Sequence, residues 1–398
     1  MRPSTRRTAL VVVAALLVVL AGCSGGTTPT SSPPGSTTAS TTGTVSPTAT
    51  ATGTTALTST ATPTSRWSPD APEEQYPPGV ADNGTLTNVT ALLDSHFAAT
   101  ANGSTVLTYE WSGPNESGIR RYAHGATATP YYSVFNRTVD GDRTTEQFYW
   151  TGTQGYARVT YDDRTRFAVY QNATGNVGAW THEDVFGRRS TLRSALVGGN
   201  YSVNGTVQRG DRTFVRLTAD EVSPSRTNVY EAYEGTVLVT PEGVVYDVDT
   251  SLVGTDNATD DRLETSITLD TDVDWSGAPP WVTDLPHLSV STTEDGHAVE
   301  IRNTGGAALP ANASFTVAVS NETVWGATIH GDVTGTVTTD GRLDPGDAVY
   351  VTVDTDGDSS SFALHEERAR GEYTVVAVGV YGSHANVSYR LETGSESS

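Results

Sequence analysis

A single cysteine follows a short apolar run near the start of the chain, in the sequence Leu20-Ala21-Gly22-Cys23. Residues 9–21 carry no charge, and three arginines precede them. A basic start, an apolar stretch and small residues before a cleavage site are typical of a secretory signal peptide. The run is shorter than the roughly 20 apolar residues of a membrane span. Since a cysteine thiolate can be alkylated, the pattern predicts a signal peptide over 1–22 and a lipid on Cys23.

The four residues that end in Cys23 resemble a bacterial-type lipobox. The resemblance implies diacylglycerol on the Cys23 sulfur, cleavage just before it, and a chain anchored on the extracellular side of the cell membrane. The alternative is an uncleaved N-terminal helix. Arg6-Arg7 with Thr8-Ala9-Leu10 also loosely resembles a twin-arginine signal, so export by the general secretory route or in folded form stays open.

The remaining reactive side chains form no recognisable catalytic or metal pattern. The eight histidines include no His-Glu-x-x-His motif. No nucleophile elbow, P-loop or dinucleotide fingerprint is found either. Asp354, Asp356 and Asp358 resemble the start of a calcium loop, but Ser359 and His365 stand where that loop needs glycine and glutamate. We therefore expect no enzyme, no cofactor and no metal, and expect His96 to pack at a helix edge.

Charge and composition constrain the environment and the partners. The chain has 398 residues and a net charge of −22, and all 24 basic residues are arginine. A surface of this kind argues against nucleic acid as a partner and fits a protein solvated in high salt. Acidic, lysine-free, threonine-rich chains resemble those of haloarchaea. Because Cys23 is the only cysteine, no disulfide can form within the chain.

Residues 24–65 contain almost only Thr, Ser, Ala, Gly and Pro and carry no charge. Such a segment cannot bury enough apolar surface to offset the entropy of ordering. With its prolines up to residue 79, it predicts a disordered, mucin-like stalk over 23–79.

Two amphipathic helices and many short strands are expected next. Leu86, Val89, Leu93 and Phe97 lie on one face of a helix over 86–101, with Thr85 as its N-cap. A second helix is expected over 183–197, ended by Gly198-Gly199. Strands are expected at 105–111, 120–126, 131–138, 143–150, 156–161, 166–171, 201–208, 213–218, 236–240, 244–253 and 263–269.

A large antiparallel sheet with two helices on one face predicts an open half-barrel. This element order resembles the LolA/LppX-like fold of lipoprotein and lipid carriers. The hairpin from Val237 to Val248 is similar to hairpins in haloarchaeal surface lipoproteins. The resemblance covers about residues 80–282, implies carriage of a hydrophobic ligand, and supplies no catalytic residues.

The sequence Ala278-Pro279-Pro280-Trp281 indicates a linker, and residues 285–392 have an all-β pattern before a polar tail at 393–398. Strands are expected at 298–302, 314–320, 348–354 and 373–380. The length suits a seven-stranded sandwich. Its turns, such as Asn303-Thr304-Gly305-Gly306, resemble Ig-like modules of archaeal surface proteins. The overall prediction is α+β: a curved antiparallel half-barrel sheet covered by two helices, followed by an all-β Ig-like sandwich.

Two sets of residues are candidate sites. Aromatic side chains of the half-barrel could line an apolar cavity or fill its core, and both interpretations stay open. The candidate lining residues are Tyr109, Trp111, Phe148, Trp150 and Phe167. Asn-x-Ser/Thr sequons, which can carry glycans outside the cell, occur at Asn83, Asn88, Asn102, Asn115, Asn136, Asn172, Asn200, Asn204, Asn257, Asn312, Asn321 and Asn386.

Two functional hypotheses follow from these patterns. In the first, a membrane-anchored, non-enzymatic lipoprotein binds or carries a lipid in its half-barrel. In the second, the chain is a structural or adhesive envelope protein that binds other surface proteins or glycans. An apolar cavity favours the first, and a filled core beside an exposed aromatic patch favours the second.

Overall fold

The computed structural model describes residues 76–127, 129–161, 164–171, 188–255, 262–271, 273–274, 277–322, 333–356 and 359–393. The expected signal peptide, Cys23 and the expected stalk up to residue 75 lie outside these ranges. Within the described ranges, no helix combines the length and the apolar character needed to span a membrane.

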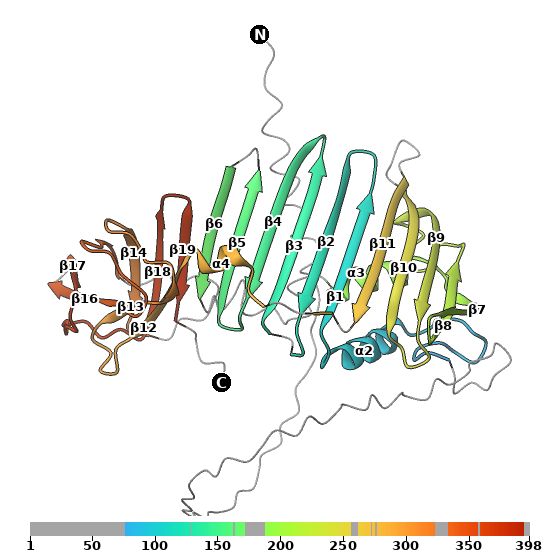
Figure 1. Cartoon of the computed structure of the whole chain (residues 1–398), viewed down its shortest axis with the longest axis horizontal. Helices are drawn as coiled ribbons and strands as arrows, with labels where there is room; N and C mark the ends of the chain where they lie inside the picture. Colours follow the sequence, from blue (N-terminus) through green and yellow to red (C-terminus); the bar gives the residue numbers. More distant parts are fainter. Residues whose placement is uncertain are drawn as a thin grey trace, which may run out of the picture. The chain divides into compact units, whose positions relative to one another are not determined.

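Most of the described chain belongs to one large, open β-sheet of 15 strands (Figure 1). Its strand order is β15-β14-β18-β19-β6-β5-β4-β3-β2-β1-β11-β10-β9-β8-β7. The strands before residue 275 are β1 Thr105–Ser112, β2 Glu116–His124, β3 Tyr131–Val139, β4 Asp142–Trp150, β5 Gln154–Tyr161, β6 Arg164–Gln171, β7 Ser202–Arg209, β8 Arg212–Ala219, β9 Tyr230–Val239, β10 Val245–Gly254 and β11 Arg262–Thr271.

Pairing along the sheet is mostly local. β1 to β6 form an antiparallel meander, and β7 to β11 form a second one. β1 joins the two by pairing with β11, with Leu107 opposite Leu269. At the other end β6 pairs in parallel with β19, with Phe167 opposite Val387. The antiparallel meanders confirm the sequence-based prediction, whereas the parallel pair was not predicted.

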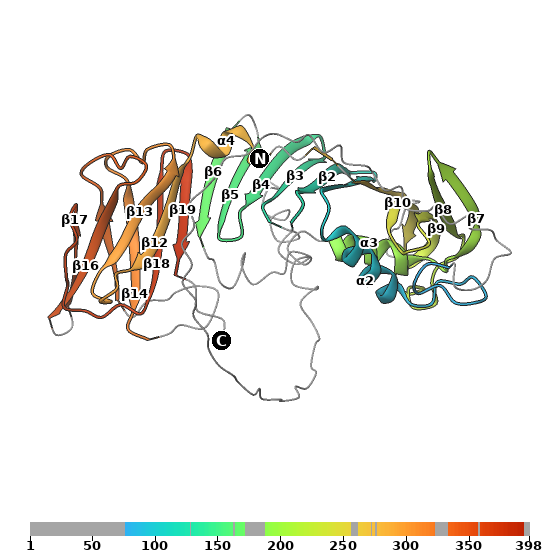
Figure 2. The same ribbon diagram turned by 60° about the horizontal axis from the view of Figure 1, so that its bottom comes forward.

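Two helices, α2 (Val89–Thr100) and α3 (Arg188–Gly198), cover one face of this sheet (Figure 2). Both place apolar side chains at helical spacing against β1, β2 and β8 to β11. The fully buried members of this helix–sheet core include Leu92, Leu93, Leu192, Leu196, Leu217, Val237, Val248 and Ile267.

The first helix begins later than the pattern predicted. Asn88 is its N-cap, and its Oδ1 accepts a hydrogen bond from the Ala91 amide at 3.1 Å. Thr85 instead forms a β-bridge with Ser202, and the Leu86 amide donates to the Tyr201 carbonyl. Because these backbone groups are used in pairing beside β7, the helix cannot include residues 85 and 86.

The second helix packs closely on the sheet through its glycine end. A Cβ at Gly198 would lie 2.3 Å from the Tyr233 ring, so only glycine allows this approach. The Tyr233 hydroxyl donates to the Ala195 carbonyl and lies 3.0 Å from the Tyr201 hydroxyl. The predicted helix stop at Gly198 is therefore also a packing contact.

The chain after residue 277 forms a second sheet and extends the first. A four-stranded sheet has the order β12-β13-β16-β17, and its apolar side chains share one core with β14, β18 and β19 of the large sheet. The elements are α4 Pro280–Thr283, β12 Pro286–Thr292, β13 Val299–Gly306, β14 Ser314–Ser320, β15 Val333–Thr338, β16 Ala348–Asp356, β17 Ser359–His365, β18 Ala377–His384 and β19 Val387–Glu392.

The segment expected to be a linker packs into this core. Trp281 is 9% exposed and Val282 is 2% exposed, both in α4. Beside them the Gln171 side chain bonds the backbone of β12, because its amide donates to the Val290 carbonyl and its oxygen accepts from the Val290 amide. The end of β6 is thus joined to β12 as well as to β19.

Candidate functional site

Alternation along β1 gives the large sheet two different faces. Leu107 and Tyr109 pack with the helix–sheet core, and Trp111 follows them on the same face. Glu110 and Ser112 project from the opposite side of the strand. We call these the helix-side face and the outer face. The same alternation on the neighbouring strands decides which residues each face brings together.

On the helix-side face, aromatic rings of β1 and β3 stack across the sheet. The centroids of Tyr109 and Trp111 lie 5.2 Å apart, and those of Trp111 and Phe135 lie 5.5 Å apart, each pair with an interplanar angle of 18°. These rings line a depression of about 520 Å³, which we call the aromatic groove. Its other lining residues are Gly113, Pro114, Asn115, Glu116, Arg120, Thr191 and Leu263.

Trp111 is held in place at both ends of its ring system. A Cβ at Gly118 would lie 2.2 Å from the indole, so the ring lies against the bare backbone of β2. The indole Nε1 donates to Glu116 at 3.2 Å. Arg137 binds both oxygens of the same Glu116 carboxylate, at 2.8 and 2.9 Å. The Glu116 charge is thereby matched within the fold.

Tyr109 and Arg120 contribute a hydroxyl and a guanidinium to the lining of the groove. Burial raises the pKa of the Tyr109 hydroxyl above its usual value, so the group is neutral at ordinary pH. The Arg120 guanidinium lies 4.2 Å over the Phe135 ring and donates to the Tyr122 hydroxyl at 3.2 Å. The groove thus combines an apolar wall with one fixed cation.

A second aromatic cluster lies further along the helix-side face. The centroids of Phe148 and Trp150 are 6.5 Å apart, and Phe148 also contacts Tyr131 and Tyr170. Both Phe148 and Trp150 approach the position where Gly155 would carry a side chain. This arrangement is aromatic packing over a strand glycine.

The five candidate lining residues therefore divide into three places. Tyr109 and Trp111 line the aromatic groove, and Phe148 and Trp150 belong to the second cluster. Phe167 projects from the outer face and packs on Trp281, with centroids 6.2 Å apart. The sequence pattern did not indicate Arg120, because only the register Tyr109–Arg120–Phe135 across three strands places it in the groove.

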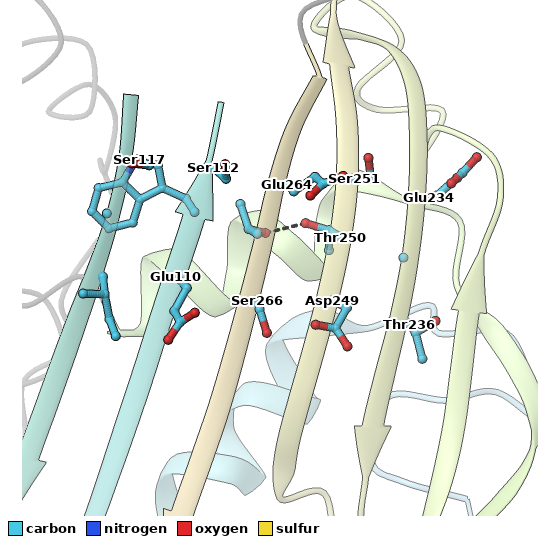
Figure 3. A pocket seen from close by; sticks show the side chains of 15 residues that line it. Glu110, Ser112, Ser117, Glu234, Thr236, Asp249, Thr250, Ser251, Glu264 and Ser266 are labelled. Atoms are coloured by element: carbon cyan, nitrogen blue, oxygen red, sulfur yellow. Dashed lines mark hydrogen bonds between the residues drawn. The ribbon is translucent and has the colours of Figure 1, made fainter. Parts of the chain in front are cut away.

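The outer face carries a second depression of about 690 Å³ over β2, β1, β11, β10 and β9, which Trp111 and Ile119 line together with carboxylate and hydroxyl residues. Figure 3 shows Glu110, Ser266 and Asp249 in one row and Ser112, Glu264 and Ser251 in the next. Each carboxylate is opposite a hydroxyl residue on the adjacent strands, so no two are directly paired. Exposed carboxylates separated in this way are typical of a solvated acidic surface.

Charged groups elsewhere form no metal centre in the described ranges, where no cluster of three or more His, Cys, Asp or Glu residues suits an ion. The Asp354 carboxylate accepts from the Glu372 amide at 2.9 Å, and Asp358 lies outside those ranges. His96 is buried between α2 and β10, where its Nδ1 accepts from the Val245 amide at 3.1 Å.

The asparagines of the described sequons differ in exposure and in the hydrogen bonds that their side-chain amides form. The Asn204 and Asn386 amides donate to Thr218 and to the Thr165 carbonyl, and Asn136 accepts from Thr145 within a strand. Asn83 and Asn88 accept from backbone amides. Asn312 lies in a turn at a φ of 63°. Asn102, Asn115, Asn200 and Asn321 are exposed and form no side-chain hydrogen bond with another described residue. Asn172 and Asn257 lie outside the described ranges.

We expect glycans at Asn102, Asn115, Asn200 and Asn321 and none at Asn136. The transferred glycan bonds to the amide nitrogen, which must be reached from solvent, and Asn136 is half-buried in β3. Glycopeptide mass spectrometry of protein isolated from its host measures occupancy at each site. Equal occupancy at Asn115 and Asn136 would contradict the idea that local structure decides between them.

The chain resembles known proteins only weakly. No family model matches the chain, and no curated protein matches it. Among solved structures, MucB in complex with MucA(peri) has 13% identity and a TM-score of 0.22, covering 70% of this chain and 92% of that chain. The Pseudomonas aeruginosa MucA/MucB complex has 12% identity and a TM-score of 0.22, covering 69% and 90%. MucB alone has 14% identity and a TM-score of 0.21, covering 64% and 92%. Likeness at these scores carries no argument.

Proposed function

We propose that this chain is a non-enzymatic lipoprotein, anchored through Cys23 on the extracellular side of the membrane, that binds a hydrophobic ligand in the aromatic groove. The groove carries the proposal, because its volume of about 520 Å³ and its stacked Tyr109, Trp111 and Phe135 rings suit an apolar chain. Ligand sites of about 300–1,000 Å³ with few polar groups are typical of small-molecule binding.

The position of the helices supports interpreting the large sheet as a half-barrel. α2 and α3 cover β1, β2 and β8 to β11, and the groove lies where α3 meets β1, between Thr191 and Tyr109. The four-stranded sheet and its shared core with β14, β18 and β19 support an Ig-like sandwich. In this proposal the sandwich braces one end of the ligand-binding sheet.

The alternative is a structural or adhesive envelope protein, with other surface proteins or glycans as partners. One observation favours it. The two parts of the chain are joined by the parallel pairing of β6 with β19 and by hydrogen bonds of the Gln171 side chain with the Val290 backbone. Such a junction suits a stiff spacer that carries load.

Native mass spectrometry of the full chain, purified in high salt from its own host membranes, tests the ligand proposal. We expect one co-purifying lipid that is lost under denaturing conditions, whereas a lipid on Cys23 remains. Trp111→Ala should lower the lipid-bound fraction, because it removes the central ring of the groove. Ser112→Ala, next to it on the outer face, should not.

A ligand-free mass that does not shift when host lipids are added would overturn the ligand proposal. That result would favour the alternative function, a structural or adhesive envelope protein.

A further inference from the structure

The aromatic groove contains one cation whose charge nothing in the described fold compensates. Three charged side chains belong to the groove and its support, namely Arg120, Glu116 and Arg137. Arg137 and Glu116 neutralise each other through two contacts. No carboxylate of the described residues lies within ion-pair distance of Arg120, whose partners there are the Tyr122 hydroxyl and the Phe135 ring.

The position of Arg120 gives its guanidinium a fixed direction. Arg120 is opposite Tyr109 on β1 and Phe135 on β3, so aromatic residues flank it on both neighbouring strands. Stacking 4.2 Å over Phe135 fixes the plane of the guanidinium, and Nη1 is the nitrogen that donates to Tyr122. An arginine has five N–H donors, and a planar fork of this kind matches phosphate and carboxylate oxygens.

Arg120 differs from the exposed arginines of the sheet, such as Arg121, because it is partly buried against aromatic rings. Because the Glu116 carboxylate is paired with Arg137, Arg120 leaves a positive group next to the aromatic wall of the groove. That combination is complementary to an amphiphile and repels cations. An anion in a half-buried groove is also screened less by salt than one at an exposed surface.

Resting on the ligand proposal above, we propose that the groove selects acidic amphiphiles, with the Arg120 guanidinium binding a phosphate headgroup and Tyr109, Trp111 and Phe135 holding the alkyl chain. One lipid-sized molecule would bind per groove, with its headgroup at β2 and its alkyl chain along the stacked rings.

Titration calorimetry with the full chain in high salt, below the micelle concentration of each probe, tests this. The probes are hexadecyl phosphate, uncharged monopalmitoylglycerol and inorganic phosphate. We expect hexadecyl phosphate to bind about 10-fold more tightly than monopalmitoylglycerol, the size of effect a charge-assisted hydrogen bond supplies. Inorganic phosphate, which lacks a chain, should not compete.

Arg120→Gln should abolish the preference for hexadecyl phosphate and leave monopalmitoylglycerol binding within about twofold, which also shows that the variant is folded. Arg121→Gln is the matched control, since Arg121 is exposed on the outer face of the same strand and the charge change is the same. It should retain the preference.

Three results would overturn the inference. Equal binding of the two amphiphiles by the unaltered chain removes headgroup selection but keeps the ligand proposal. Tight binding of inorganic phosphate makes the site a simple anion site. Binding of neither amphiphile overturns both proposals together.

Discussion

Replacing Cys23 by serine is expected to move the chain from the membrane fraction to the soluble fraction almost completely. Serine cannot supply the thiolate that carries the lipid, and each buried CH₂ of such a lipid contributes about 0.8 kcal/mol to membrane binding. Intact mass after detergent extraction measures the same event directly. The unaltered chain should begin at Cys23 and carry the added lipid mass, and Cys23→Ser should lack it.

Ser24→Ala is the matched control, because it changes the next side chain and keeps the thiol. Its mass and its distribution should equal those of the unaltered chain. An unaltered chain that retains residues 1–22 and carries no added mass would contradict the prediction. The apolar run at 9–21 would then act as an uncleaved helix, which is the alternative that the sequence leaves open.

Local patterns predicted the bounds of several strands closely. The strand at Ser314–Ser320 has the predicted bounds, and β1 differs from its prediction by one residue. Where pairing with a neighbouring strand decides where a strand begins or ends, the sequence pattern does not predict the bounds correctly. β9 starts at Tyr230 rather than 236, because residues with weak strand preference, such as Glu234 and Gly235, are held by their ladder with β10.

Four strands of the C-terminal part, β12, β15, β17 and β19, were not predicted from the sequence. β12, β15 and β17 each pair with a strand next to them in the chain, and β19 pairs with the adjacent β18 and with the distant β6. β18 was expected at 373–380 but spans Ala377–His384, because Tyr373 and Val375 donate to the Val353 and Gly296 carbonyls instead of joining one ladder. Sequence periodicity contains no information about such partners.

The same limit applies to the site. Aromatic composition suggested a cavity lining, and alternation correctly places Tyr109 and Trp111 on one face. Phe167 has similar surroundings in the sequence but projects from the other face, where Trp281 covers it. Arg120 became a candidate only through its register with Tyr109 and Phe135, since a lone arginine in a strand otherwise suggests a solvated position.

His96→Ala is expected to lower the free energy of unfolding by about 3–5 kcal/mol, the usual cost of removing a large buried side chain. His96 is 2% exposed, its ring packs edge-on against Phe97 with centroids 4.9 Å apart, and its Nδ1 accepts from the Val245 amide. Truncation would leave a cavity between α2 and β10 and a buried amide without its partner. Against the 5–15 kcal/mol typical of a native fold, this is a large loss.

Two further variants separate the causes. His96→Leu keeps most of the volume and removes the acceptor, so it should cost about 1–3 kcal/mol. His384→Ala, at the end of β18, should change the stability by less than about 0.5 kcal/mol. Equilibrium urea unfolding in high salt, followed by circular dichroism, measures all three. If His96→Ala and His384→Ala unfolded at the same urea concentration, His96 would not tie the first helix to the sheet, and the support of α2 for the helix-side face would have to come from Leu92, Leu93 and Phe97 alone.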